Sequence, residues 1–319
     1  TFSTVATYID DTPMTSANGP AQQLGGSLFD IERVEVLKGP QGTLFGEGSQ
    51  GGTIRYIYNE PDPERVDYKI KAGFNTQNES DDTGYRVDGM INLPLADNFA
   101  VRVSAFSEEK AGWMDKVNLT PIEEDINTLE STGGRLSAKW WPTDRLSIRG
   151  SVFYVDTETE GSPFGQVPHD ERENVRIPGL AAMSEDEFTL YNLRFDYNFD
   201  FATFTSTTSY FERDTHSLIE SPASLAFLFD AYGGFLVNLQ SFQSGGAPII
   251  PCNPGVQDPS LSNFFACPYG DGQNLTAFNN DSTSESKRFV QEFRLVSSGD
   301  GPWQWTAGAF YKTSEDFRL

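Results

Sequence analysis

Long apolar runs and basic residues are scarce in this chain of 319 residues. No apolar run approaches the roughly 18 residues that a membrane-spanning helix needs, and the mean hydropathy is −0.44. Transmembrane helices are therefore excluded, but a membrane β-barrel is not, because barrel strands are apolar only at every second position. The 46 acidic residues face only 23 basic ones, for a net charge of −23. This balance argues against nucleic-acid binding.

Histidine and cysteine are also rare. His169 and His216 are the only histidines, and neither has a second ligand at metal-binding spacing. Without a Ser/His/Asp grouping either, the sequence predicts no catalytic residues, no metal site and no enzyme. Cys252 and Cys267 lie in a Pro-, Asn- and Gly-rich stretch and predict one local disulfide, with Cα atoms within about 7 Å. Two free thiols are the alternative.

The most informative segment spans residues 28–57. An apolar strand at 34–37 ends at Gly39–Pro40, a run of glycine-marked turns follows, and a second strand is expected at 53–58. A phosphate-binding loop is disfavoured, because no Gly-Lys-Ser/Thr ending and no helical pattern follow. Arg33 and Glu35 lie two apart on one strand and are expected on one face. The structural motif comprises Arg33, Glu35, Gly39, Pro40, Gly42, Gly46, Gly51 and Gly52.

This segment closely resembles the end of the plug domain of TonB-dependent outer-membrane receptors. The resemblance rests on Ile-Glu-Arg-Val-Glu-Val-Leu-Lys-Gly-Pro at 31–40, Gly-Thr-Leu-Phe-Gly at 42–46, and Gly51–Gly52. Residues 136–146 and 291–295 resemble barrel segments of the same family. Glu47–Gly48 and the residues 55–57 depart from the family pattern, which suggests a subfamily without defining its substrate.

After Pro63, apolar and polar residues alternate over segments of about ten residues, which is typical of barrel strands. Nine strands are expected, within residues 66–74, 85–93, 99–105, 136–140, 146–154, 191–199, 202–211, 287–296 and 303–312. Their connections alternate between tight turns and long loops, the latter at 76–83, 109–132, 157–187 and 213–286. Outer-membrane barrels have short periplasmic turns and longer extracellular loops.

The alternation also predicts which side chains face lipid. The lipid-facing set comprises Tyr68, Ile70, Val101, Val103, Leu193 and Phe195, and the lumen-facing set comprises Lys69, Arg102 and Arg194. Outward aromatic residues near strand ends would form an interfacial girdle: Trp140, Tyr154, Phe195, Tyr197, Trp303 and Trp305. The alternative to a membrane barrel is a soluble β-sandwich with one wet face.

The predicted fold class is therefore all-β. Residues 1–63 are expected to be the C-terminal part of an α+β plug domain, and residues 64–319 the N-terminal portion of a transmembrane antiparallel β-barrel. Single-chain bacterial barrels have even strand numbers, and plugged ones close at about 22 strands. We therefore expect an open, partial barrel of about nine strands, in which 66–75 and 303–315 do not pair. Such a chain is expected not to be a complete functional unit.

The resemblance implies active import of a scarce nutrient across the bacterial outer membrane, with a ferric siderophore as the leading substrate. It implies energy from the TonB–ExbB–ExbD complex through a segment outside this chain, contact with outer-membrane lipid and lipopolysaccharide, and no cofactor, because an iron chelate would be the substrate. A non-transporting adhesin or structural barrel is the alternative. Residues proposed for substrate contact lie in the plug's apical loop and the longest outer loop: Met14, Asn18, Gln22, Phe227, Phe229 and Tyr232.

Overall fold

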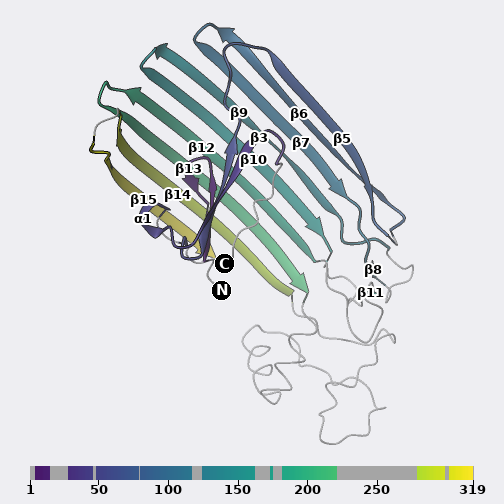
Figure 1. Ribbon diagram of the computed structural model, residues 1–319. Helices are drawn as coiled ribbons and strands as arrows, with labels where there is room; N and C mark the ends of the chain where they lie inside the picture. The colour runs from purple at the N-terminus through teal and green to yellow at the C-terminus, as the bar shows by residue number, and fades with distance from the viewer. Residues whose placement is uncertain are drawn as a thin grey trace, which may run out of the picture.

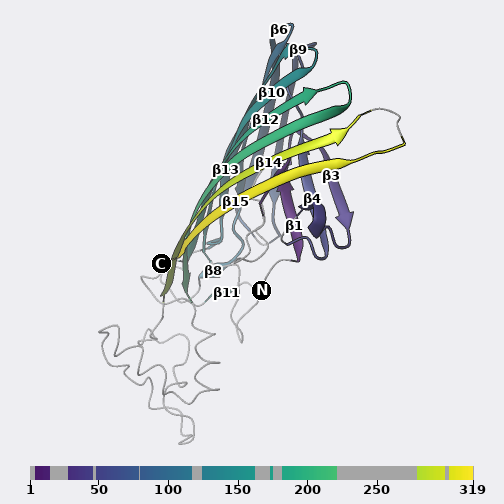
Figure 2. The same cartoon turned by 90° about the vertical axis from the view of Figure 1, so that its left-hand side faces the viewer.

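The chain forms a broad curved sheet, the wall, and a small sheet, the plug, which lies on one face of the wall (Figures 1 and 2). This computed structural model describes residues 4–14, 28–45, 48–78, 80–116, 124–161, 173–174, 182–220, 279–298 and 302–318. Among these residues, no helix is long and apolar enough to cross a membrane.

The wall contains all nine strands that the alternation predicted. They pair antiparallel with their neighbours in chain order. Their bounds are β5 (Asp67–Thr76), β6 (Thr83–Ala96), β7 (Phe99–Lys110), β9 (Leu129–Thr143), β10 (Leu146–Glu160), β12 (Met183–Asn198), β13 (Ala202–Glu220), β14 (Asn279–Ser297) and β15 (Thr306–Arg318). Within the described part of the chain, β5 and β15 form the two edges and do not pair with each other. The predicted open sheet is confirmed.

The strands are longer than predicted at the end where the long connections lie. The expected loop at 213–286 begins only after β13, and β13 and β14 each have 19 residues. At about 3.3 Å per residue, each strand spans roughly 60 Å, more than twice an apolar band of about 25 Å. The prediction failed because the apolar alternation stops at the membrane boundary. Backbone pairing continues past it, since Arg213 still lies opposite Asp186 and Ser286.

The predicted facing is supported for four of the six lipid-facing residues and for all three lumen-facing ones, while Val101 and Phe195 are half-buried. Tyr68 and Ile70 are about three-quarters exposed on the outer face, and Val103 and Leu193 are exposed there too. Lys69, Arg102 and Arg194 point the other way and contact plug residues.

The wall departs from its predicted pattern at two places. Trp303 and Trp305 are exposed as expected but precede β15. The Trp305 amide bonds to the Ser297 hydroxyl, and the Trp305 carbonyl accepts the Ser297 amide. Gln291 breaks the apolar outward pattern of β14. Its side chain accepts a hydrogen bond from the Thr208 hydroxyl and donates one to Ser206.

The plug sheet has the strand order β2 (Thr12–Pro13), β1 (Val5–Ile9), β4 (Gly52–Tyr58), β3 (Ile31–Lys38). The two strands expected at 34–37 and 53–58 are β3 and β4, which pair antiparallel. A single helical turn, α1 (Gly42–Phe45), was not predicted and interrupts the glycine-rich connection between them. Gly39 has a φ of 84°, as its place in a turn requires.

An apolar cluster joins the plug to the wall. Ile9, Met14 and Tyr58 of the plug pack with buried wall residues, namely Phe106, Phe153, Val155, Phe188, Leu190 and Phe211. Three of the wall rings form a row across β10, β12 and β13, with centroids 5.5 and 6.0 Å apart, and Tyr58 adds a fourth ring 5.5 Å from Phe153. The face predicted to be a polar lumen therefore carries an apolar patch where the plug is seated.

A third, two-stranded parallel sheet joins two of the long connections. It pairs β8 (Asp115–Lys116) with β11 (Glu173–Asn174), and the sequence pattern did not predict it. The connections at this end of the wall therefore hold structure of their own (Figure 1).

Candidate functional site

Buried ion pairs fasten the plug to the inner face of the wall. One of these pairs, with almost no exposed side-chain surface, joins Asp30, just before β3, to Arg102 on β7. Arg102 Nε donates to Asp30 Oδ2 at 2.9 Å and Nη2 donates to Oδ1 at 2.5 Å. Their side chains are only 2% and 8% exposed. A bidentate pair of this kind fixes both position and orientation.

A second group of ion pairs lies beside it, on β9 and β10. Asp10 receives Arg135 at 3.4 Å and Arg149 at 3.6 Å, and its Oδ1 also accepts the Tyr58 amide. Glu60 binds Lys139, and Arg149 at 2.6 Å. Burial alone would raise the pKa of the Glu60 carboxyl, but the charge of Arg149 and the hydrogen bond and charge of Lys139 lower it below its ordinary value.

A chain of ion pairs connects the motif at the end of the plug to the wall. Arg33 Nε donates to Glu35 at 2.9 Å, so these two side chains share a face as predicted. Glu35 accepts from Arg55 at 2.7 Å, and Arg55 also pairs with Asp11 at 3.1 Å. Asp11 pairs with Arg194 of β12 at 2.6 Å. The motif residues therefore act within the plug, and Asp11 makes the contact with the wall.

Hydrogen bonds that involve no carboxylate extend the interface to β13 and β14. The hydroxyls of Thr12 and Ser209 lie 2.7 Å apart, and the Asn192 amide donates to both. Arg288 Nη1 donates to the Pro13 carbonyl at 3.2 Å. The plug strand β2 is thus held by wall strands that lie far from it in the sequence.

The residues proposed for substrate contact are only partly covered by the structure. Met14 is 2% exposed and packs in the apolar cluster, while its amide donates to the Thr7 carbonyl. Gly39, Pro40, Gly42, Gly51 and Gly52 lie at the ends of the plug strands or in the connection between them. The remaining candidates lie outside the described residues: Asn18, Gln22, Gly46, Phe227, Phe229, Tyr232 and both members of the predicted disulfide, Cys252 and Cys267.

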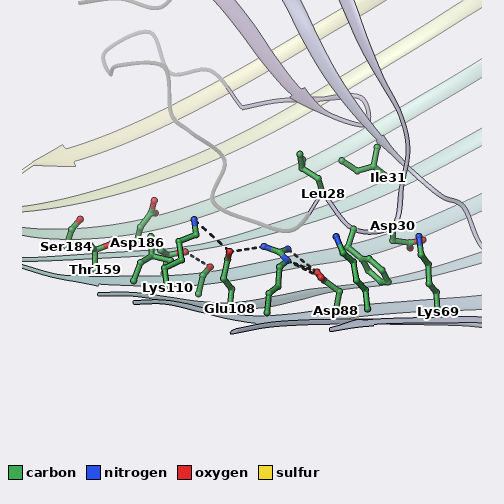
Figure 3. A pocket seen from close by; sticks show the side chains of 16 residues that line it. Leu28, Asp30, Ile31, Lys69, Asp88, Glu108, Lys110, Thr159, Ser184 and Asp186 are labelled. Carbon is green, nitrogen blue, oxygen red and sulfur yellow. Dashed lines mark hydrogen bonds and ion pairs between the residues drawn. The ribbon is translucent and has the colours of Figure 1, made fainter. Parts of the chain in front are cut away.

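A cavity of about 840 Å³ lies between the plug and the wall. Residues 28–31 of the plug form one side, and strands β5, β6, β7, β9, β10 and β12 form the other (Figure 3). Its residues on β7, β9, β10 and β12 all come from the strand ends next to the long connections. The cavity thus occupies the half of the lumen on the side where the alternation of turns and loops places the exterior.

Charged side chains dominate the wall side of this cavity. Figure 3 shows Asp88, Glu108 and Lys110 directed toward the plug residues Leu28 and Ile31. Arg86 donates to Asp88 at 2.9 Å and to Glu108 at 2.8 Å. Our prediction from the sequence did not include these residues. The available signal was that they occupy the lumen-facing positions of strands whose outward positions are apolar.

These observations define the class of protein: a membrane-barrel wall with a plug held against its inner face. Residues 2–53 match the family model of the TonB-dependent receptor plug domain. The pesticin receptor of Yersinia enterocolitica is 28% identical over 142 residues, which are 44% of this chain and 19% of that protein. The ferric aerobactin receptor of Klebsiella pneumoniae is 26% identical over 147 residues, covering 45% and 18%.

Comparison with solved structures shows that the fold is also similar to that of such receptors. The ferric yersiniabactin uptake receptor FyuA from Yersinia pestis superposes with a TM-score of 0.67 at 15% identity, over 99% of this chain and 40% of that one. The match to the pesticin and ferric aerobactin receptors spans about a fifth of the length of each of those relatives. The resemblance seen in the sequence is confirmed in plug motif, sequence and fold as that to TonB-dependent receptors, and so is the predicted location in the bacterial outer membrane.

Proposed function

We propose that this protein takes part in the TonB-dependent import of a ferric siderophore across the outer membrane. The observation that carries the proposal is the plug sheet, held on the inner wall by buried ion pairs at Asp10, Asp11 and Asp30. A lumen that holds a docked domain does not serve free diffusion. Passage of a solute requires the plug to move, and breaking buried ion pairs requires energy.

The substrate proposal is supported by the relatives. One is named for ferric aerobactin, and a solved structure of the same fold is described as a ferric yersiniabactin uptake receptor. Aerobactin and yersiniabactin are different chelators, so the names support the class of substrate rather than one compound. In this proposal the iron chelate is the substrate, and the protein has no resident cofactor and no enzymatic activity.

The proposed energy source is the TonB–ExbB–ExbD complex. The proposed surroundings of the wall are outer-membrane lipid and lipopolysaccharide, which suit an outer face carrying exposed Trp140, Tyr154 and Trp303. Asn18, Gln22, Phe227, Phe229 and Tyr232 remain proposed substrate contacts. The alternative adhesin or structural barrel gains no support from a docked plug, since adhesion does not need one.

Uptake by living cells tests the proposal. Cells that make the protein are grown under iron starvation, and accumulation of radioactive iron is measured with each of several ferric chelates. We expect accumulation with at least one chelate, and its loss when the gene for this protein or for TonB is deleted. Equal accumulation in all three strains with every chelate would refute import. Production of the protein that does not respond to iron would argue against iron as the cargo.

A further inference from the structure

Each carboxylate that lines the cavity binds an arginine, and two of the four share one. Asp88 and Glu108 bind Arg86 within the cavity. Asp186 receives Arg213 Nε at 2.6 Å, and Asp30 receives Arg102. Neither Arg102 nor Arg213 lines the cavity, so both supply positive charge from behind its surface.

Three lysines line the same cavity, and none of them is the main ion-pair partner of a lining carboxylate. Lys69 and Lys71 lie two apart on β5, both are exposed, and both therefore face the lumen. Within the described part of the chain, neither has a carboxylate at ion-pair distance, and Lys69 Nζ lies 5.2 Å from the centre of the Phe29 ring. Lys110 Nζ lies 3.8 Å from a Glu108 carboxylate that already binds Arg86 at 2.8 Å, and its side chain is 54% exposed.

The balance of charge around the cavity therefore differs from that of the protein as a whole. Four acids and four bases line it, and Arg102 and Arg213, which pair with Asp30 and Asp186 from behind the surface, add two positive charges. The chain as a whole carries −23. Lysines without a carboxylate of their own attract anions and concentrate them locally, the more so inside an acidic protein.

The other side of the cavity carries neutral hydrogen-bonding groups. Ser131, Thr157, Thr159 and Ser184 line it from β9, β10 and β12. At about 840 Å³ the cavity is within the range of about 300–1,000 Å³ that is usual for small-molecule sites. Its surface thus suits a ligand with a negatively charged edge toward β5 and β7 and polar groups toward β9 to β12.

We infer that the cavity binds an anionic, oxygen-rich metal chelate, and that Lys69, Lys71 and Lys110 select for its negative charge over uncharged or cationic chelates. This inference rests on the proposed function and adds the charge class of the substrate and the residues that read it. Lysine is suited to this role, because its ammonium is a mobile point charge that adapts to differently spaced oxygens.

The test measures binding to the protein as its own cell makes it, purified from the outer membrane in detergent. The probes are the ferric complexes of citrate and aerobactin, which are anionic, of ferrichrome, which is uncharged, and of ferrioxamine B, which is cationic. Affinities are measured by quenching of tryptophan fluorescence at low and high salt. The variants are K71Q, the double variant K69Q/K71Q, and K71R. The matched control is K287Q, since Lys287 lies on β14 outside the cavity and pairs with Glu212 and Glu285.

We expect the wild type to prefer an anionic chelate and to lose affinity for it as salt increases. The double variant should bind that chelate roughly tenfold or more weakly, as the loss of one or two charge-assisted hydrogen bonds implies. K71R should restore binding and K287Q should leave it unchanged. Equal thermal unfolding of all the variants would show that they are folded.

Two results would overturn the inference. If the uncharged or cationic chelate binds best and the lysine variants bind like the wild type, the selectivity is wrong, while the proposed import of a ferric chelate stands. If no chelate binds and cells accumulate none of the four, the proposed function fails and the inference fails with it.

Discussion

The buried pair between Asp30 and Arg102 offers the sharpest test of how the plug is held. Asp30 has a φ of 68°, a conformation that asparagine also tolerates, so D30N removes the charge with little backbone strain. Arg102 would then remain 8% exposed without a counter-charge. Breaking a buried ion pair by removing one partner costs about 3–5 kcal/mol. We expect D30N and R102M each to weaken plug–wall docking by roughly this amount.

An exposed pair of the same chemistry provides the control. Arg145 and Asp200 approach to 2.7 Å in the turn region, but their side chains are 55% and 84% exposed. Exposed pairs contribute about 0–1 kcal/mol, so R145M should be almost neutral. The double variant D30N/R102M should be less destabilised than the sum of its single variants, since it leaves no unpaired buried charge.

Two measurements report on docking. Thermal unfolding of the protein in detergent gives the change in stability. Sensitivity of intact cells to antibiotics too large for porins reports loosening of the plug. D30N and R102M cells should become sensitive, whereas R145M cells should not. If D30N unfolds like R145M and its cells stay resistant, the pair does not anchor the plug and the argument from burial is wrong.

Three further predictions concern other parts of the chain. Because the pKa of the Glu60 carboxyl is lowered, the carboxylate stabilises docking fully above its ordinary pKa, and this contribution is lost as pH falls through the lower folded value. E60Q should therefore flatten the acid end of a pH–stability curve, and an unchanged curve would exclude this role. At Gly52, φ is 156° and a Cβ would lie 2.6 Å from a carbonyl oxygen of β3. G52A should therefore cost about 1–3 kcal/mol, while G42A, with open space around it, should unfold like wild type; equal unfolding of the two variants would contradict this. Cys252 and Cys267 are still predicted to form a disulfide, which intact mass before and after alkylation with and without reductant will test; two alkylated thiols without reductant would disprove it.

The barrel wall was largely predictable because its strands obey a local rule. Successive side chains of a strand point to opposite faces, so Tyr68 and Lys69 were assigned to opposite faces from sequence alone. The rule failed where its signal is absent. Beyond the membrane the outward positions of β13 and β14 no longer need to be apolar, so the alternation did not predict that both strands extend there.

The plug could be recognised for a different reason. Glycines at required turns and a short apolar strand form a motif that depends on neighbouring residues only, and the pairing of β3 with β4 follows from it. The docking of the plug could not be read in the same way. Asp30 and Arg102 are 72 positions apart, and Pro13 and Arg288 are 275 apart.

The sequence by itself therefore determined the class of fold, the facing of the strands and the presence of a plug, because each depends on spacing along the chain. Only the tertiary structure decided which wall cations meet which plug carboxylates, and which lysines remain for the cavity. The 23 lysines and arginines could not be told apart by type or spacing alone. In the folded chain Arg86 pairs with Asp88 and Arg102 pairs with Asp30, while neither Lys69 nor Lys71 has a carboxylate partner among the described residues.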